Sequence, residues 1–504
     1  MKKKIIHGLL ALAALNSTTV LADFANKTFM NDRGSLSNNV LMARNVCGRN
    51  SKKKDAVGAN VSVAAYYSQS YNHTNLAKYF GDGTNVTPTG LIDVSLDAAA
   101  TTGLQSGMID PQSTASSRAD IALAMHGDVA LNPRRIEAGA QIQWNQCLHK
   151  LVDGAWMSVA APVVYVRTEM RPTYTSTANA TSSAAKGMGK GLADYFGGES
   201  LGKTVLAAVA FTQDALAKQV ITPTYNSVTQ VADVNVTLGY DFLREKSYKV
   251  GASIHGLIPT GNKEAGLVAM EPIAGNRSFF FGAGLHTRFN LWKSEDKSSS
   301  FKMHASAKYS YGFGADQVRT LGLTNVTTGV VPVAQYGLVG DIGTSHYMPL
   351  ANVSTLTVSV EPRSRLEAIA GFCYRFNRFT ANVAYNLFYA QAETLKLKGT
   401  FDETNYARVL STGVVTASAS AFAVDAYTTQ GGLILATSPI VTNALDLTAC
   451  TTPAQVVHKV GGDLAYSFDS KLPIRIAAGG SVDFNSSNTS FTSWTVFGKV
   501  GFSF

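Results

Sequence analysis

The chain has 504 residues and a formal charge of +9, and its 45% hydrophobic and 15% charged residues make it too apolar to be disordered. This charge is small for the length, and no Lys/Arg cluster exceeds residues 52–54, which argues against a nucleic-acid partner. No segment after the first residues approaches the roughly twenty consecutive apolar residues of a membrane helix. A membrane-spanning form of this chain must therefore be a β-barrel.

The first 22 residues follow the three-part pattern of a secretory signal peptide. Lysines at positions 2–4 are followed by an apolar stretch over residues 5–15 and by small residues that end at Ala22. The apolar stretch is too short to cross a bilayer. We predict export with cleavage near Ala22, which leaves a mature chain that starts at Asp23.

Residues 23–57 are polar and lack sustained periodicity. We predict an N-terminal extension that lies in the periplasm or reaches into the mouth of a barrel. Residues 58–504 repeat one pattern, in which a segment of alternating polarity, a short polar turn, a second segment and a long loop follow one another.

The alternation predicts about twelve strands, with fourteen as the alternative count. In residues 299–314, Phe301, Met303 and other apolar residues alternate with Lys302, His304 and other polar ones. The predicted strands cover residues 59–72, 135–148, 155–171, 231–244, 246–258, 278–293, 299–314, 364–376, 378–391, 455–468, 473–485 and 491–504.

The more apolar face of these strands is almost free of charge. It has roughly 75 positions, where chance would place about eleven charged residues, yet we find none, and His458 is its one imidazole. A lipid-facing surface requires this exclusion. The loops agree, because short turns and long connections alternate along the chain, as they do between the periplasmic and outer ends of outer-membrane barrels. We predict an all-β, transmembrane antiparallel up-and-down β-barrel.

The last predicted strand is amphipathic and ends on an aromatic residue. Trp494, Val496, Val500, Phe502 and Phe504 share one face. This resembles the closing strand of Gram-negative outer-membrane β-barrels, which commonly ends in Phe. The resemblance implies that Phe504 and Phe502 form an assembly signal read by the barrel-assembly machinery, and that outer-membrane lipid surrounds the protein.

One hairpin carries a narrower resemblance. Residues 231–242 begin with Val-Ala-Asp and contain Gly-Tyr before the turn, and residues 250–262 end in Pro-Thr-Gly-Asn. The hairpin looks like one in FadL-like outer-membrane transporters and the related phenol-degradation MetA-type barrels. This resemblance covers about thirty residues and implies uptake of small hydrophobic compounds. Residues 23–57 show no match to the FadL plug domain.

The opposite face of the strands carries charges of both signs, with an excess of basic groups. In a water-filled lumen they would orient polar solutes and favour anions slightly, although many could simply pair and stabilise the wall. The predicted pore-lining residues are Arg167, Arg288, Lys302, Lys308, Arg375, Lys459, Arg475, Lys499, Glu137, Glu169, Asp233, Asp241, Glu367, Asp463 and Asp483.

The long loops contain two further patterns. Residues 76–81, Leu-Ala-Lys-Tyr-Phe-Gly, are nearly repeated at 192–197, as a duplicated element or by coincidence. Residues 201–219 place apolar side chains at near-helical spacing, which predicts a short helix over or within the pore, or one packed among the loops.

No catalytic motif, cofactor site or metal site is apparent, and we predict a protein that is not an enzyme. His255, His286 and His304 face the lumen on consecutive strands but at different heights, so structural roles are favoured over a metal site. Cys147 and Cys373 share the lumen parity near the periplasmic end, and one of them could form a disulfide with Cys47.

The sequence therefore predicts a porin-like outer-membrane channel for small polar solutes in a Gram-negative bacterium. The alternatives are a FadL-like transporter of small hydrophobic compounds and a structural or adhesive barrel whose loops occlude the pore. Twelve strands leave a narrow lumen that inserted side chains could close. Association into a homo-oligomer stays open.

Overall fold

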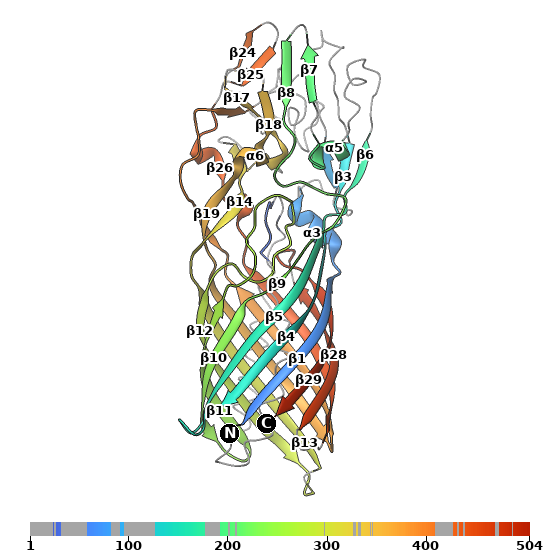
Figure 1. Cartoon of the computed structure of the whole chain (residues 1–504), viewed down its shortest axis with the longest axis vertical. Helices are drawn as coiled ribbons and strands as arrows, with labels where there is room; N and C mark the ends of the chain where they lie inside the picture. The colour runs from blue at the N-terminus through green and yellow to red at the C-terminus, as the bar shows by residue number, and fades with distance from the viewer. Residues whose placement is uncertain are drawn as a thin grey trace.

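The computed structural model is a tall molecule with a β-barrel at one end and a layer of packed loops, the crown, at the other (Figure 1). We call the opposite end of the barrel, with the short connections, the turn end. The crown comprises the described parts of residues 71–133, 170–225, 259–279, 313–362, 391–454 and 487–492. The structure describes residues 24, 27–31, 58–81, 91–94, 127–176, 192–199, 202–206, 209–296, 298–325, 329–330, 334–342, 344, 346–408, 427–430, 433–436, 439–468, 473–485 and 487–503.

Twelve strands among the described residues close into an antiparallel barrel, which confirms the predicted fold class. Neighbouring strands pair in chain order, and the last strand pairs with the first, with Val63 opposite Val500. The barrel strands are β1 (Ala59–Ser70), β4 (Arg134–Cys147), β5 (Ala155–Glu169), β10 (Val234–Arg244), β11 (Tyr248–Ile258), β12 (Phe280–Lys293), β13 (Ser299–Gly312), β20 (Arg363–Phe376), β21 (Phe379–Ala390), β27 (Gln455–Phe468), β28 (Ile474–Asn485) and β29 (Ser493–Ser503), with β9 (Asn226–Val231) as a thirteenth member of the sheet.

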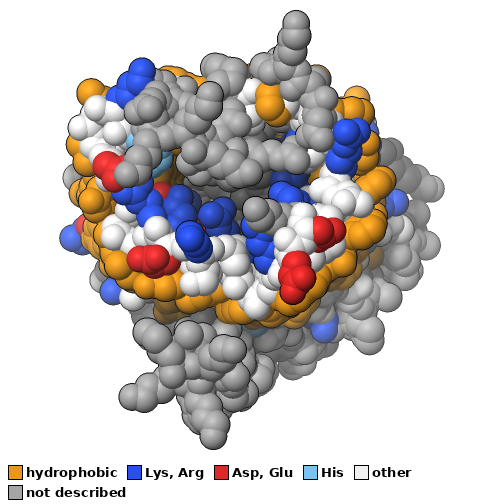
Figure 2. Space-filling model, turned by 90° about the horizontal axis from the view of Figure 1, so that it is seen from below, with side chains coloured by type: hydrophobic (Ala, Val, Ile, Leu, Met, Phe, Trp, Pro, Cys, Tyr) orange, Lys and Arg blue, Asp and Glu red, His pale blue; other side chains and the backbone are white. Residues whose placement is uncertain are grey.

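The barrel is apolar outside and polar inside, because each strand has a period of two. Seen from the turn end, hydrophobic side chains form the outer ring and Lys and Arg side chains lie inside it (Figure 2). Aromatic pairs mark both ends of the apolar belt: Phe301 stacks on Phe372, and Phe279 packs against Phe313. Residues 301 and 313 are separated by roughly 30 Å along the barrel axis, at about 3.3 Å per residue and a tilt of about 40°. This height matches the hydrocarbon core of a bilayer.

Among the described residues, the belt contains one imidazole, at the position that the alternation predicts. His458 accepts or donates a 2.6 Å hydrogen bond through Nδ1 to the hydroxyl of Tyr385, and it stacks on Phe484. A polar group on the outer face is thereby provided with a partner, which lowers the cost of placing it in lipid.

Two β-bulges change which residues of the wall face outward. In β12 the register shifts between Asn290 and Trp292, so that Trp292 lies opposite the outward-facing Phe301. Strict alternation along β12 would place Trp292 in the lumen, and the extra residue explains the difference. A second bulge in β10 exposes both Phe242 and Leu243 on the outer face.

The wall is broken at Ala232 and Asp233. β5 pairs with β10 over residues 155–160 and with β9 over residues 163–168. The predicted strand over residues 231–244 therefore begins only at Val234, and β9, which precedes the break, was not predicted. β9 is the edge of the described sheet because it pairs only with β5 there.

The crown contains short strands and helices, and no helix among the described residues is long and apolar enough to cross a membrane. The helices are α3 (His73–Phe80), α5 (Leu192–Phe196), α6 (Leu350–Ser354), η1 (Ala334–Tyr336), η2 (Thr442–Ala444) and η3 (Thr448–Cys450). The crown strands are β2 (Leu91–Val94), β3 (Gly127–Ala130), β6 (Thr173–Ser176), β7 (Gly202–Leu206), β8 (Val209–Gln213), β14 (Ala315–Thr320), β15 (Gly322–Asn325), β16 (Gly329–Val330), β17 (Leu338–Asp341), β18 (His346–Pro349), β19 (Thr355–Glu361), β22 (Thr394–Leu397), β23 (Tyr406–Arg408), β24 (Tyr427–Gln430), β25 (Leu433–Ala436) and β26 (Leu445–Asp446).

The predicted helix over residues 201–219 is wrong. Its first part forms the antiparallel hairpin β7 and β8, and Leu216 packs separately in the core of the crown. β7 and β8 each contain one Val and one Thr, which favour strands, and the near-helical spacing of the segment was coincidental.

Candidate functional site

The crown half of the lumen carries charges that are matched by partners. Glu137 accepts hydrogen bonds from Tyr66 at 2.5 Å and from Arg135 at 3.2 Å. Lys459 lies 3.1 Å from Asp483 and has no exposed surface. Such pairs stabilise the wall, because each buried charge retains a counter-charge.

A further pair of polar side chains helps to fill the middle of the lumen. The Asn386 amide donates to Glu367 at 2.9 Å and is also fully buried. The lumen of the described barrel is therefore occupied by side chains at this level. A twelve-stranded barrel is narrow enough for this to happen.

The turn half of the lumen is different, because its charges are mostly basic. Asp241 contacts both Lys249 and His286, the latter at 2.7 Å. Asp463 accepts a 2.7 Å hydrogen bond from Asn382. Eight cations of this half lie on the inward parity of β10, β11, β12, β13, β20, β28 and β29: Arg244, Lys249, Arg288, Lys293, Lys302, Arg375, Arg475 and Lys499.

Two predicted pore-lining residues lie elsewhere. Arg167 is opposite Ile136 in the register, and its neighbours Val166 and Thr168 point inward and are buried. Arg167 and Glu169 therefore share the outward parity at the crown end of β5, where they form a 2.5 Å ion pair with each other. The sequence assignment followed the charges of this strand, whereas the apolar Val164 and Val166 face inward.

The remaining predicted pore residues have the inward parity or lie at the break in the wall. Asp233 is buried at the break, where its Oδ2 accepts hydrogen bonds from the backbone N and the Nδ2 of Asn276 at 2.6 and 2.8 Å. Arg365 holds the same asparagine through its Oδ1 at 2.7 Å. Lys308 lies opposite Glu367 in the crown half. Phe502 faces outward on β29, and Phe504 lies outside the described residues.

The histidines and cysteines of the lumen have individual surroundings. His255 lies 3.0 Å from Ser310, whereas His286 bonds to Asp241. No group of three metal-ligating side chains occurs within the described ranges. Cys147 and Cys373 are free thiols, and Cys47 lies outside the described residues, so its disulfide stays a prediction.

The N-terminal segment, residues 24 and 27–31, lies inside the crown and far from the start of β1. Backbone N–H groups of Lys27 and Thr28 donate to Tyr79 and Ala449 in two different loops. Asn488, in the last loop, both donates to and accepts from the backbone of Phe24. The segment thus joins connections that are distant in sequence.

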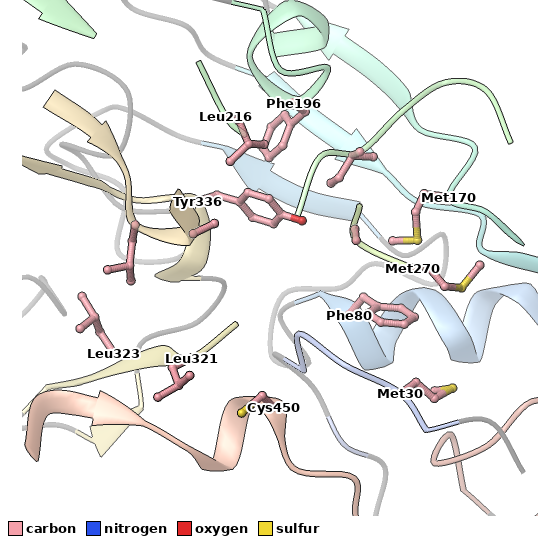
Figure 3. Close-up of a cluster of buried hydrophobic side chains, with 14 of the residues drawn as sticks. Met30, Phe80, Met170, Phe196, Leu216, Met270, Leu321, Leu323, Tyr336 and Cys450 are labelled. Carbon is pink, nitrogen blue, oxygen red and sulfur yellow. The ribbon is translucent and has the colours of Figure 1, made fainter. Parts of the chain in front are cut away.

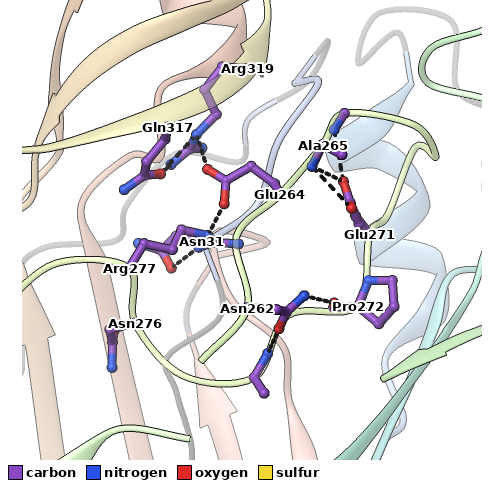
Figure 4. A network of polar contacts seen from close by, with 12 residues as sticks. Asn31, Asn262, Glu264, Ala265, Glu271, Pro272, Asn276, Arg277, Gln317 and Arg319 are labelled. Atoms are coloured by element: carbon purple, nitrogen blue, oxygen red, sulfur yellow. Dashed lines mark hydrogen bonds and ion pairs between the residues drawn. The ribbon is translucent and has the colours of Figure 1, made fainter. Parts of the chain in front are cut away.

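Two buried arginines, Arg277 and Arg319, hold the segment at Phe29. Figure 4 shows both of them beside Asn31 and Glu264. The guanidinium carbon of Arg319 lies 3.0 Å from the centre of the Phe29 ring, and that of Arg277 lies 4.8 Å from it. Arg277 also donates to the side-chain oxygen of Asn31 at 3.2 Å. Cation–π contacts to a partly buried ring contribute about 0.5–1 kcal/mol each.

Two glutamates balance these arginines. Glu264 lies 2.5 Å from Arg277 and 3.7 Å from Arg319, and Glu393 lies 3.6 Å from Arg319. All four side chains are at most 4% exposed. Burial lowers the pKa of Arg319, and the two carboxylates act in the opposite direction. We call these four residues and Phe29 the clamp. Sequence reasoning missed it, because its members come from separate loops without a shared period.

Phe29 of the clamp packs against a large buried apolar cluster. Figure 3 shows part of this cluster. Its buried members come from α3, α5, β15, the N-terminal segment and several loops, and they include Met30, Phe80, Met170, Phe196, Leu216, Met270, Leu321, Leu323, Tyr336 and Cys450. Burial raises the pKa of the Cys450 thiol to about 12.

The two Leu-Ala-x-Tyr-Phe-Gly copies have the same structure. Each forms the end of a helix whose Tyr and Phe rings meet edge to face at 5.3 Å. The glycine N–H then bonds the carbonyl of the Ala four residues earlier, at 3.0 Å in the first copy and 2.9 Å in the second. The repeat is a structural element that inserts two rings into the crown core.

The chain resembles known barrels in fold alone. No protein-family model and no curated protein matches it. Similar solved structures include an outer membrane channel from Pseudomonas putida F1, with TM-score 0.35 and 8% identity over 89% of this chain and 96% of that chain. Others are the Pseudomonas putida toluene transporter TodX (0.31, 9%, 96% and 98%) and a Pseudomonas aeruginosa FadL homologue (0.27, 8%, 89% and 90%). Because these TM-scores are below 0.5, the similarity says nothing about the transport path or the cargo of this chain.

Proposed function

We propose that the protein is an outer-membrane channel for small hydrophobic compounds, with the crown outside the cell and the turn end in the periplasm. The observation that carries the membrane location is the outer face of the barrel. Leu285 and Leu464 are 62% and 71% exposed there, within a belt that is as tall as a bilayer core. Lipid, rather than water, is the solvent that suits this face.

The lumen supports a selective path over free diffusion. Lys459 and Asn386 have no exposed surface, so side chains occupy the middle of the barrel. General diffusion of polar solutes needs a continuous file of water. This arrangement favours the hydrophobic-compound channel over the open porin that the sequence predicts first.

The apolar side chains of the crown support the proposal that the transported compounds are hydrophobic. Met30, Met170 and Met270 lie with Phe80 on one side of the apolar cluster (Figure 3). Thioether side chains adapt to irregular apolar shapes, which suits a surface that must part and close around a small compound. The clamp at Phe29 would hold this surface closed until the N-terminal segment moves.

Uptake across a lipopolysaccharide-containing bilayer tests the proposal, because such a leaflet resists hydrophobic solutes. Vesicles containing the protein should take up labelled small hydrocarbons faster than protein-free vesicles, and they should swell slowly in sugars. Rapid swelling in sugars without hydrocarbon uptake would contradict the proposal and support a porin for small polar solutes, which the basic turn half favours.

A structural or adhesive barrel is the remaining candidate, and the size of the crown favours it. A correctly folded protein that shows neither hydrocarbon uptake nor single-channel conductance would support that function. Cross-linking in the same vesicles would show whether protomers associate.

A further inference from the structure

Charge is distributed unevenly along the lumen. In the crown half, acidic groups such as Glu137, Glu367 and Asp483 lie beside donors or cations. In the turn half, the inward positions of the described strands carry eight cations and two carboxylates, and Figure 2 shows Lys and Arg side chains inside the barrel as seen from this end. The eight are Arg244, Lys249, Arg288, Lys293, Lys302, Arg375, Arg475 and Lys499.

The two carboxylates of this half have partners of their own. Asp241 is shared by Lys249 and His286, and Asp463 accepts from Asn382. The negative charge of these two carboxylates is therefore largely balanced by their own partners. Arg288 and Lys302 form no ion pair with any residue in the described part of the chain.

These two cations lie close enough to repel each other. In the register of β12 and β13, Arg288 lies opposite His304 and Asn290 lies opposite Lys302, so the two cations are diagonal neighbours on adjacent strands. Across the sheet on β20, the neighbour of Lys302 is Cys373. Arg288 is exposed to the lumen, and Lys302 is half-buried. Like charges held together in a partly dehydrated channel are unfavourable unless an anion joins them.

We infer that Arg288 and Lys302 form an anion site that binds the carboxylate of small organic acids at the turn end of the lumen. An Arg fork fits a carboxylate in the plane of its two oxygens, and the ammonium adds a point charge. The inference extends the proposed function, since it adds hydrophobic compounds that carry an acid group to the expected cargo.

Cys373 offers a direct probe of the site. The full-length C47S/C147S protein, folded in detergent, retains Cys373 and the buried Cys450. We would compare its reaction rates with two methanethiosulfonate reagents, one bearing a sulfonate and one bearing a trimethylammonium group. The same thiolate attacks both reagents and displaces methanesulfinate from each, so the ratio of the rates reports the local potential.

Cys147 supplies the matched control, as it lies at the same end and its charged neighbours are one lysine and one aspartate. We expect the sulfonate-to-ammonium rate ratio at Cys373 to exceed that at Cys147, measured in C47S/C373S, by at least about tenfold. R288Q/K302Q should reduce the excess to about twofold or less. K396Q/K398Q removes the same charge from the crown and should leave the ratio unchanged. Heat-modifiable gel migration verifies that each variant is folded.

Competition identifies the ligand. At constant ionic strength, benzoate should slow sulfonate modification of Cys373 more than chloride does, and R288Q/K302Q should abolish the difference. Stronger protection by inorganic phosphate, or equal protection by all three anions, would overturn the carboxylate site, as would equal rate ratios at the two cysteines. Hydrocarbon uptake is measured separately, so its failure alongside intact selectivity at Cys373 would overturn the proposed function alone.

Discussion

The barrel and the crown place their apolar and charged groups in opposite ways. The barrel turns Ile142 and Leu464 outward and keeps charges such as Lys459 within. The crown buries its leucines, methionines and aromatic rings, but it also buries the four charges of the clamp at its centre. The barrel is therefore organised for lipid, and the crown for water.

This difference separates two sources of stability. The wall depends on continuous backbone pairing and on a lipid solvent, so a single side chain matters mainly through the face that it occupies. The crown depends on long-range contacts, and the N-terminal segment is one of the pieces that it encloses. In the barrel, the effect of a substitution should therefore depend on the face that the side chain occupies, which we call the face rule. In the crown, it should depend on whether the partners of the side chain keep a counterpart, which we call the partner rule.

The largest effect is expected in the clamp. R319M should destabilise the crown by about 3–5 kcal/mol, because it leaves Glu393 and part of Glu264 buried without a counter-charge. R319M/E393Q should recover most of this loss, since the Arg277–Glu264 pair remains. Hydrogen exchange of β14 and β19 amides measures both. Equal destabilisation by the single and double variants would mean that packing against Phe29, rather than charge, is what Arg319 supplies.

Neighbouring positions on β4 test the face rule. I142R places a cation on the outer face, where Ile142 is 50% exposed, and should cost about 2–4 kcal/mol in the unfolding free energy measured in vesicles. Q143R places the same cation one residue away on the lumen side and should cost less than about 1 kcal/mol. Similar costs for both would show that the belt does not contact lipid at this height.

An intermediate effect is expected for F29A. Loss of the ring removes two cation–π contacts and apolar area, together about 2–3 kcal/mol, from the contact between the N-terminal segment and the crown. Faster proteolysis of the segment in the folded protein would report its release. F24A is the control, because Phe24 contacts only Lys27 among the described cations, with Nζ 5.5 Å from the ring centre. If F24A and F29A are cleaved equally fast, the clamp does not hold the segment.

Sequence reasoning predicted the wall closely, with every barrel strand except the broken β9 and β10 starting and ending within two residues of its expected limits. Period two is a local property, so it survives without knowledge of neighbours. It failed where an extra residue reset the face, at Trp292, and where charge was taken as a guide to the lumen, at Arg167. The clamp could not be predicted, because Phe29 and Arg319 are joined only by tertiary structure.

The smallest effect tests the partner rule in the most exposed part of the crown. His346 bridges two carboxylates, with Nδ1 2.6 Å from Asp341 and Nε2 3.0 Å from Asp214. Hydrogen bonds to Asp214 and Asp341 raise the pKa of His346 above its usual value near 6.5. The imidazolium therefore contributes its full stabilisation below about pH 6.5 and loses it as the pH rises through the elevated pKa.

Solvent screening limits this contribution to less than about 1 kcal/mol, because the side chain of His346 is 35% exposed. Hydrogen exchange of the β17–β18 hairpin, corrected for the intrinsic effect of pH, should become faster between pH 6 and pH 9 in the wild type. H346Q should remove this dependence, whereas H149Q, at a barrel turn, should retain it. A wild-type hairpin whose corrected exchange is independent of pH would show that the two carboxylates hold the strand pair without a charged histidine.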